Sequence, residues 1–145
     1  MWRRSGCWVG REKIVKRVKR RGLTNVRVLR LESSYFLEWM CPAESVARVH
    51  IMFPDPWPKR RHHKNRLIQE SFLVTLHKVL AVGGEVRFTT DHAEYFEWAQ
   101  ELWLKRSDLF EKRGAWDATG DPPTDFERHF QQEGRLFHRC AWGKK

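Results

Sequence analysis

Polar and apolar positions follow a helical period in some segments of this chain and alternate in others. Residues 10–21 carry a narrow apolar stripe, which predicts a helix that Gly22 caps. Residues 25–31 alternate between polar and apolar side chains, so they predict a strand. A short helix is then predicted over residues 33–40.

The rest of the chain continues to alternate between the two kinds of element. Residues 46–53 are rich in strand-forming side chains, and the strand is expected to end at Pro54. Residues 54–66 predict a loop too polar to be buried. The elements expected after it are a helix over 68–80, a Gly83-Gly84 turn, a strand over 85–89, a helix over 93–105, a loop over 113–123, a short helix from Thr124 and a final strand over 136–142.

Alternating helices and strands predict an α/β domain with a mainly parallel sheet, and the 145 residues suit one domain. Three acidic residues, Glu32, Asp55 and Asp91, fall at or just after predicted strand ends. Ligands of such sheets bind at the carboxyl ends of the strands. The pattern therefore predicts a site that these three carboxylates share.

The net charge of +10 is concentrated at one end of the chain. Residues 1–30 hold 11 Lys and Arg against a single acid, Glu12, whereas the remaining residues hold 17 of each sign. An excess of basic residues favours a polyanionic partner, most often nucleic acid. The alternative is a solvated helix face.

The number of cysteines and the hydropathy of the chain indicate in which cellular compartment it is expected. The three cysteines, at positions 7, 41 and 140, form neither a disulfide framework nor a metal-binding pair, which favours the cytoplasm. No apolar run is long enough to span a membrane, and the N-terminal residues lack the apolar stretch of a signal peptide.

The segment FPDPWPKRRHHKNR, residues 53–66, places one carboxylate beside a dense basic run. Prolines on both sides of Asp55 restrict the backbone, which favours a rigidly held functional carboxylate. The alternative is an aspartate that accepts a hydrogen bond from its own turn. Trp57 is expected either to pack beneath the loop or to face a nucleobase.

Five cations of this segment, Lys59, Arg60, Arg61, Lys64 and Arg66, predict contacts with phosphate groups. The adjacent His62 and His63 have no third ligand nearby, so no metal site is predicted. Farther along the chain, Asp91, Thr124 and Glu127 could accept hydrogen bonds from the N1–H and amino group of a guanine. The competing interpretation of Thr124 and Glu127 is a helix capping box.

Three motifs occur in a characteristic order: FPDPWPKRRHHKNR, then TTDHAEYFEW at 89–98, then TDFERHFQQEGR at 124–135. Together they resemble the tRNA (guanine-N7)-methyltransferases of the bacterial TrmB type, over roughly residues 22–140. The resemblance implies a Rossmann-like class I methyltransferase fold and S-adenosylmethionine (S-adenosyl-L-methionine) as the methyl donor. It implies methylation of N7 of a guanine in the tRNA variable loop.

The resemblance also implies roles for individual residues. Asp55 matches a catalytic and cofactor-facing acid, and Glu32 falls where the family has an acid near the adenine. Lys59, Asp91 and the segment Thr124, Asp125, Phe126 and Glu127 match substrate-binding positions. The positions that match the RNA-contacting stretch are Arg61, His62, His63, Lys64, Asn65 and Arg66.

The family also has a first strand, a glycine-rich loop that holds the cofactor, and a second strand. Only Gly6 and Gly10 stand before Glu12 here, so we expect a partial domain over residues 1–145 that lacks the first strand and this loop. S-adenosylmethionine binding by the chain alone should then be weak or absent. Either the chain is truncated, or another chain supplies the missing part.

Two further functional hypotheses remain at this point. The chain could be an RNA-binding remnant without methyl transfer, or a basic α/β domain with a structural role. Binding of the methyl donor separates the enzyme from the remnant, because both are expected to bind RNA. A monomer or a homodimer is expected.

Overall fold

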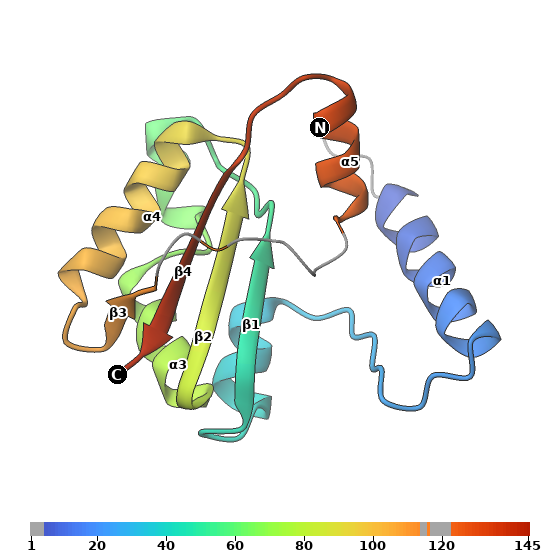
Figure 1. Cartoon of the computed structure of the whole chain (residues 1–145), viewed down its shortest axis with the longest axis horizontal. Coiled ribbons are helices and arrows are strands. Elements are labelled where there is room, and N and C mark those ends of the chain that lie inside the picture. The colour runs from blue at the N-terminus through green and yellow to red at the C-terminus, as the bar shows by residue number, and fades with distance from the viewer. Residues whose placement is uncertain (1–4, 114–115, 117–122) are drawn as a thin grey trace. The chain divides into compact units, whose positions relative to one another are not determined.

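The computed structural model describes residues 5–113, 116 and 123–145, with side chains described from residue 12 onward within these ranges. The chain divides into two compact units, Met1–Glu32 and Ser33–Lys145. The first unit holds one helix, and the second holds a four-stranded sheet with its helices (Figure 1).

The first unit contains α1 (Ser5–Arg20), which begins earlier than the sequence pattern predicted. Gly22 ends it in the left-handed region with φ 62°. The amide of Leu23 donates to the Val18 carbonyl at 3.2 Å and that of Gly22 to the Lys19 carbonyl at 3.1 Å, which is a Schellman motif. The predicted C-cap is therefore confirmed.

The predicted strand over residues 25–31 is wrong, because these residues form no ladder in the structure. Their alternation is nevertheless visible in the burial pattern, since Val26 and Val28 are half-buried and their neighbours are exposed. A strand requires a partner for its backbone groups. Among the described residues none pairs with this segment.

The second unit follows the predicted order of elements closely. Its bounds are α2 (Ser33–Tyr35), η1 (Phe36–Met40), β1 (Val46–Met52), η2 (Arg60–Asn65), α3 (Glu70–Val79), β2 (Leu80–Thr90), α4 (Ala93–Lys105), β3 (Phe110–Lys112), α5 (Asp125–Gln132) and β4 (His138–Lys144). The sequence pattern missed β3. It also predicted a turn at Gly83-Gly84, whereas both glycines lie within β2.

The strand order is β1-β2-β4-β3. Only β1 and β2 run parallel, whereas β4 is antiparallel to both β2 and β3. The prediction of a mainly parallel sheet is therefore corrected. The long connection from α4 through β3 and α5 returns the chain to the end of the sheet where β2 finishes, so β4 must run back beside β2.

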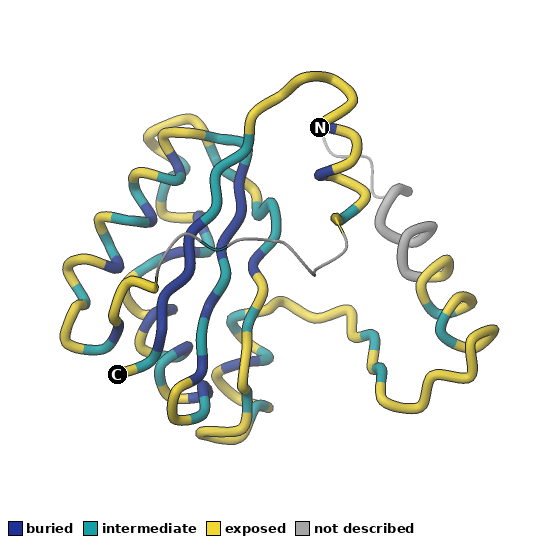
Figure 2. Tube along the Cα trace, viewed as in Figure 1, coloured by how far each residue is buried: buried dark blue, intermediate teal, exposed yellow. Residues whose placement is uncertain are grey.

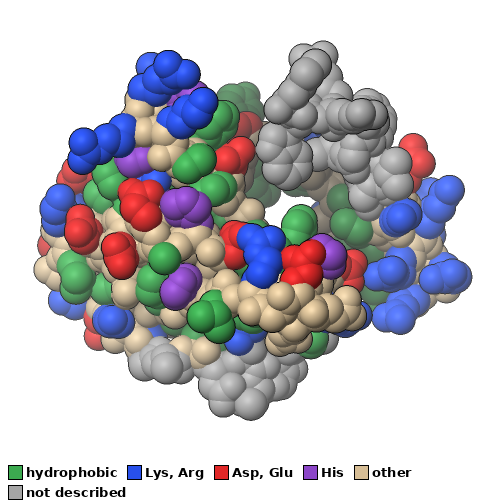
Figure 3. Space-filling view, turned by 90° about the horizontal axis from the view of Figure 1, so that it is seen from above, with side chains coloured by type: hydrophobic (Ala, Val, Ile, Leu, Met, Phe, Trp, Pro, Cys, Tyr) green, Lys and Arg blue, Asp and Glu red, His purple; other side chains and the backbone are tan. Residues whose placement is uncertain are grey.

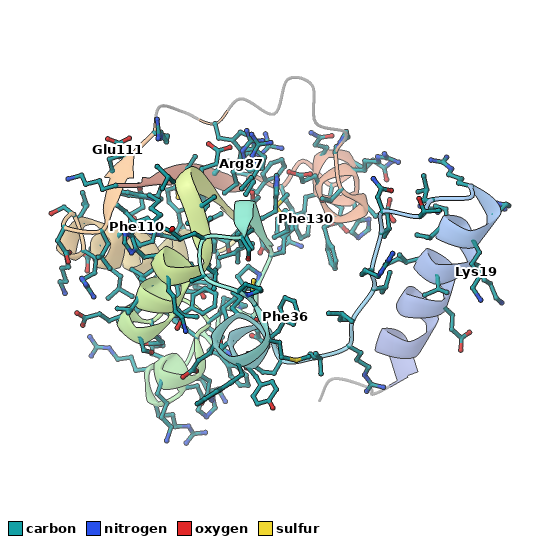
Figure 4. The ribbon with its side chains drawn as sticks, turned by 90° about the horizontal axis from the view of Figure 1, so that it is seen from below. Lys19, Phe36, Arg87, Phe110, Glu111 and Phe130 are labelled. Carbon is teal, nitrogen blue, oxygen red and sulfur yellow. The ribbon has the colours of Figure 1, made fainter. Side chains whose placement is uncertain are left out.

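One face of the sheet carries the hydrophobic core, which α3 and α4 cover (Figures 1 and 4). Side chains from α4 pack on Phe88 of β2, and the Trp103 and Trp142 rings stack with centroids 5.8 Å apart. Figure 2 shows the buried positions concentrated along β2 and β4 and on the helices. This packing fixes the sheet against α4, the helix that later supports the candidate site.

The other face of the sheet is polar. Glu85 of β2 forms an ion pair with Arg48 of β1 at 2.6 Å and another with Arg87 of its own strand at 2.8 Å. The Arg87 guanidinium, labelled in Figure 4, also lies 5.2 Å from the centre of the Trp116 ring. Within the described part of the chain, no helix is long and apolar enough to cross a membrane.

Gly84 offers a test of the β1–β2 pairing. A Cβ atom here would lie 2.9 Å from the Ala81 carbonyl and 3.0 Å from the Ala47 carbonyl, beside an irregularity in the ladder. Backbone oxygens cannot move aside cheaply. We expect Gly84→Ala to lower the free energy of unfolding by about 2–3 kcal/mol, measured by urea denaturation.

Gly83→Ala is the matched control. Gly83 has φ 73°, yet an added Cβ would meet no atom within 4 Å. Only backbone strain is then introduced, which costs about 1 kcal/mol. A larger loss from Gly83→Ala than from Gly84→Ala would contradict the proposed steric role of Gly84.

Candidate functional site

The carboxyl ends of β1 and β2 meet the start of β4 at one edge of the sheet. Met52 pairs with Thr89, and Thr89 pairs with Arg139. The Phe53 amide donates to the Thr89 carbonyl at 2.8 Å and extends the ladder by one residue. The segments that follow Phe53 and Thr90 therefore leave the sheet side by side. Figure 3 looks onto this end of the molecule.

Asp55 lies in a tight turn directly after β1. The Trp57 amide donates to Asp55 Oδ1 at 3.2 Å, so the predicted alternative, an aspartate that caps its own turn, is confirmed. The carboxylate is nevertheless exposed at the edge of the sheet. The turn therefore fixes one oxygen of an exposed Asp55 carboxylate.

Two strained residues flank this turn. Phe53 has φ 51° and Trp57 has φ 43°, values that bulky side chains seldom adopt. Such strain costs about 1–3 kcal/mol per residue and persists only where the surroundings impose it. Trp57 is half-buried and meets the His62 ring edge-on at 5.8 Å, so it packs within the loop. Contact of Trp57 with a base stays a prediction.

The basic loop, residues 59–66, divides its side chains between two directions. Lys59, Arg60, Arg61, Lys64 and Asn65 are exposed, and most of them lie on the helix η2. His62 is half-buried and lies 3.3 Å from Arg61 Nε, whereas His63 turns its ring toward Trp98 of α4. The exposed members thus form a cationic surface beside the Asp55 turn.

Arg66 is the exception within this loop, because its side chain is 0% exposed. Its Nε donates to the Pro56 carbonyl at 2.9 Å, and its two terminal nitrogens donate to the carboxylate of Glu94 on α4. The guanidinium also lies about 5 Å from the Tyr95 and Trp98 rings. Arg66 therefore anchors the loop to α4, and its contact with RNA stays a prediction.

Neighbouring contacts reinforce this anchor. Gln69 donates to the carbonyls of His63 and Arg66, and the Trp98 indole donates to the Ile68 carbonyl at 3.3 Å. The hydrogen bonds from Arg66 hold the pKa of Glu94 below its usual value, and burial opposes that shift only partly. The Glu94 carboxylate is therefore ionised near neutral pH.

The short helix α5 begins at the predicted capping box, which the structure confirms. The Glu127 amide donates to Thr124 Oγ1 at 3.1 Å, and the Thr124 amide donates to Glu127 Oε2 at 2.6 Å. The other carboxylate oxygen of Glu127 accepts from Arg139 at 2.6 Å. Burial raises the pKa of Glu127, but the hydrogen bonds from Arg139 and Thr124 outweigh it and lower the pKa overall.

An aromatic cluster attaches α5 to the end of β1. The Phe53 ring lies 5.2 Å from Phe130, 5.7 Å from Phe126 and 6.1 Å from Phe137. Figure 4 labels Phe130 beside the strands. Phe126 remains 58% exposed, so part of its ring faces solvent at this edge. The strained backbone of Phe53 therefore serves to direct its ring toward α5.

Asp91 follows β2, as predicted, and is half-buried. Its Oδ2 accepts a hydrogen bond from Arg135, the residue shortly after α5, at 2.6 Å. Asp91 thus pairs with an arginine from the segment between α5 and β4, and Glu127 pairs with an arginine at the start of β4. The structure brings Asp55, Asp91 and the start of α5 to the same edge.

Glu32 does not follow a strand, because the predicted strand over residues 25–31 is absent. It is exposed and belongs to the first unit. Its assignment near the adenine of a cofactor stays a prediction. Asp125 is exposed on the first turn of α5. For the exposed residues of the basic loop, contact with RNA stays a prediction.

Sequence reasoning missed Arg135 and Arg139 as parts of this edge. A signal was present for Arg139, since it stands between apolar residues in the predicted final strand, and a half-buried arginine needs an acidic partner. Nothing in the sequence identified Glu127 as that partner. In the part of the chain that is described, no cluster of three His, Cys, Asp or Glu could hold a metal ion.

The model of the family described as "Putative methyltransferase" matches residues 9–140. This chain belongs to that family. The match includes the Asp55 turn, the basic loop and α5, so the whole candidate site lies within the family's homologous region. The methyltransferase resemblance inferred from the three motifs is therefore confirmed.

Curated relatives carry the name tRNA (guanine-N(7)-)-methyltransferase. The one from Syntrophotalea carbinolica is 41% identical over 133 residues, which cover 89% of this chain and 57% of the relative. The one from Nocardia farcinica is 35% identical over 150 residues, covering 93% and 55%. The chain spans about half the length of the curated relatives it matches.

Solved structures agree with the fold assignment. SMU.1697c, "a putative methyltransferase from streptococcus mutans in complex with SAH", has a TM-score of 0.52 at 9% identity and covers 92% of this chain and 69% of its own. An S-adenosylmethionine-dependent methyltransferase from Mesorhizobium loti has a TM-score of 0.50 at 14% identity and covers 91% and 76%. The predicted Rossmann-like methyltransferase fold is confirmed.

Replacing Arg66 should destabilise the domain. Arg66→Met keeps an apolar stem but removes the hydrogen bonds to Pro56 and Glu94, so the half-buried Pro56 loses the donor to its carbonyl. We expect the free energy of unfolding to fall by about 2–3 kcal/mol, because hydrogen bonds that involve charged groups are among the stronger ones. Urea denaturation followed by circular dichroism measures this change.

Arg60→Met provides the comparison, since Arg60 lies in the same loop but is exposed. Its effect should remain within about 0.5 kcal/mol. Equal losses for the two variants would show that Arg66 does not anchor the loop.

Proposed function

We propose that this chain carries out S-adenosylmethionine-dependent methyl transfer to N7 of a guanine in the variable loop of tRNA. The observation that carries the proposal is the exposed Asp55 carboxylate, fixed in a strained turn between the sheet edge and a cationic loop. The names of the curated relatives support the same reaction and substrate.

The chemistry requires little from a general base. Guanine N7 carries a lone pair and no proton, so the main task of the protein is to align N7 with the methyl group. The methylated guanine becomes positively charged. A fixed carboxylate near the reacting atoms stabilises that developing charge, and Asp55 has the placement for this electrostatic role.

The surrounding residues receive the remaining roles in this proposal. The exposed cations of the basic loop bind the phosphates around the target, and Lys59 lies nearest to the Asp55 turn in sequence. Asp91, Phe126 and the capping box of α5 hold the guanine. Glu127 is itself buried, and its two carboxylate oxygens accept hydrogen bonds from the Thr124 amide and from Arg139, which hold the start of α5 in place.

The residues at the edge fit the sulfonium end of S-adenosylmethionine, because Asp55 offers an exposed carboxylate to a cation. When bound, this cofactor supplies the methyl group. Glu32 is proposed to face its adenine. We further propose that both units belong to one methyltransferase domain, since the family match spans residues 9–140. A cytoplasmic monomer or homodimer completes the proposal.

RNA binding without methyl transfer is the competing function. It predicts the same affinity for tRNA and the same salt dependence. Only the methyl donor separates the two functions, so assays of transfer are best run at a saturating donor concentration.

Asp55→Asn tests the electrostatic role most selectively. The amide oxygen of asparagine can still accept from the Trp57 amide, so the turn is kept while the charge is lost. We expect methyl transfer to fall by about 10²- to 10³-fold and tRNA affinity to stay within a few-fold. Transfer of labelled methyl groups and a filter-binding titration measure the two quantities.

Two further variants control this experiment. Asp55→Ala removes both the charge and the turn hydrogen bond, and should abolish transfer. Glu101→Gln removes an exposed acid of α4 and should leave transfer unchanged. A large loss of tRNA affinity in Asp55→Asn would instead assign Asp55 a structural role.

A further inference from the structure

The first unit carries a second cationic surface that the candidate site does not use. Four cations of α1, Lys13, Lys16, Arg17 and Arg20, are all exposed. Their spacing of three, four and seven residues places them on one face of the helix. The apolar residues Ile14, Val15 and Val18 fall on the opposite face. We call the four cations the α1 stripe.

The positive charges of the α1 stripe are not paired with acids among the described residues. None of its four cations makes an ion pair with any acid in the described part of the chain. In the second unit, by contrast, arginines such as Arg66, Arg135 and Arg139 pair with carboxylates. Unpaired like charges at this spacing repel one another and destabilise the helix.

Lys and Arg side chains dominate the visible face of this unit in Figure 3, and Figure 4 shows Lys19 extending away from the helix. Residues 1–30 hold nearly the entire net charge of the chain, with 11 cations against one acid. A solvated helix face would ordinarily mix both signs. The charge pattern thus fits a polyanion that neutralises the whole face.

We propose that the α1 stripe, in addition to the basic loop, binds the phosphate backbone of the tRNA. This inference rests on the proposed tRNA substrate. Each stripe cation that contacts a phosphate releases a counterion, so it contributes to the salt dependence of binding. The stripe positions the RNA and reads no sequence, because lysine and arginine contacts to phosphates carry no base information.

A triple variant, Lys13→Gln with Lys16→Gln and Arg17→Gln, tests the stripe. Glutamine is a good helix former, so α1 is retained, which circular dichroism checks. We expect the logarithmic salt slope of tRNA binding to fall in magnitude by about 2–3, and the affinity near 0.1 M salt to fall roughly tenfold or more. Binding is measured by titration of labelled tRNA over a range of salt concentrations.

Two controls match this variant. Lys78→Gln with Lys105→Gln and Lys112→Gln removes the same charge from exposed positions of the second unit and should leave the slope nearly unchanged. A charge-conserving variant, Lys13→Arg with Lys16→Arg and Arg17→Lys, should bind as the unaltered chain does. Loss of binding in that variant would show that charge is not what the stripe contributes.

Further outcomes separate this inference from the proposed function. If the glutamine stripe variant matches the second-unit control while Arg61→Gln with Lys64→Gln still lowers the slope, the stripe proposal is overturned and tRNA binding stands. If the unaltered chain shows no salt-dependent tRNA binding, the proposed function fails as well. Stripe-dependent binding to anionic phospholipid vesicles, without an effect on tRNA, would also overturn the proposal.

Discussion

The candidate site depends on one buried guanidinium. Arg66 loses its hydration inside the domain, a cost of several kcal/mol that the Glu94 carboxylate, the Pro56 carbonyl and two aromatic rings offset together. These partners come from the loop after β1 and from the helix after β2. A single side chain therefore joins the two segments that leave the sheet edge, and it fixes the loop that carries the exposed cations.

The acids at this edge differ in whether an arginine pairs with them. Carboxylates that stabilise the fold, Glu94 and Glu127, pair with arginines, whereas Asp55 accepts one hydrogen bond from its own turn and stays exposed. A carboxylate that forms an ion pair with an arginine has its charge already neutralised, so it adds little electrostatic stabilisation to a cationic reaction centre. Among the described acids of this edge, Asp55 makes no ion pair with an arginine, which is why the proposed chemistry centres on it.

Much of this arrangement could be predicted from the sequence, because local signals determine it. The cap of α1, the capping box of α5 and the end of β1 shortly before Pro54 all follow from residues close together in the chain. The three motifs also indicated the family. The predicted strand over residues 25–31 was wrong. Alternation of polar and apolar residues indicates which side chains are buried, but a strand also needs a partner strand for its backbone hydrogen bonds.

Long-range pairing explains what else the sequence pattern missed. Arg66 stands in a run of cations, and no local feature distinguishes it from Arg60 or Lys64, since its partner Glu94 lies 28 residues away. The antiparallel direction of β4 depends on how the chain returns after α5, and the arginine partners of Asp91 and Glu127 arise from that return. The sequence pattern identified the acids of the candidate site. It did not identify Arg135 and Arg139, which donate hydrogen bonds to Asp91 and Glu127.

The most direct test of the proposed function is to locate a transferred methyl group. Purified chain is incubated with unmodified tRNA and a saturating concentration of S-adenosylmethionine that carries a labelled methyl group, and the tRNA is then cleaved selectively at N7-methylguanine. The account predicts label at N7 of a guanine in the variable loop. A folded chain that binds the tRNA but leaves it unlabelled, or labels another atom, would contradict it.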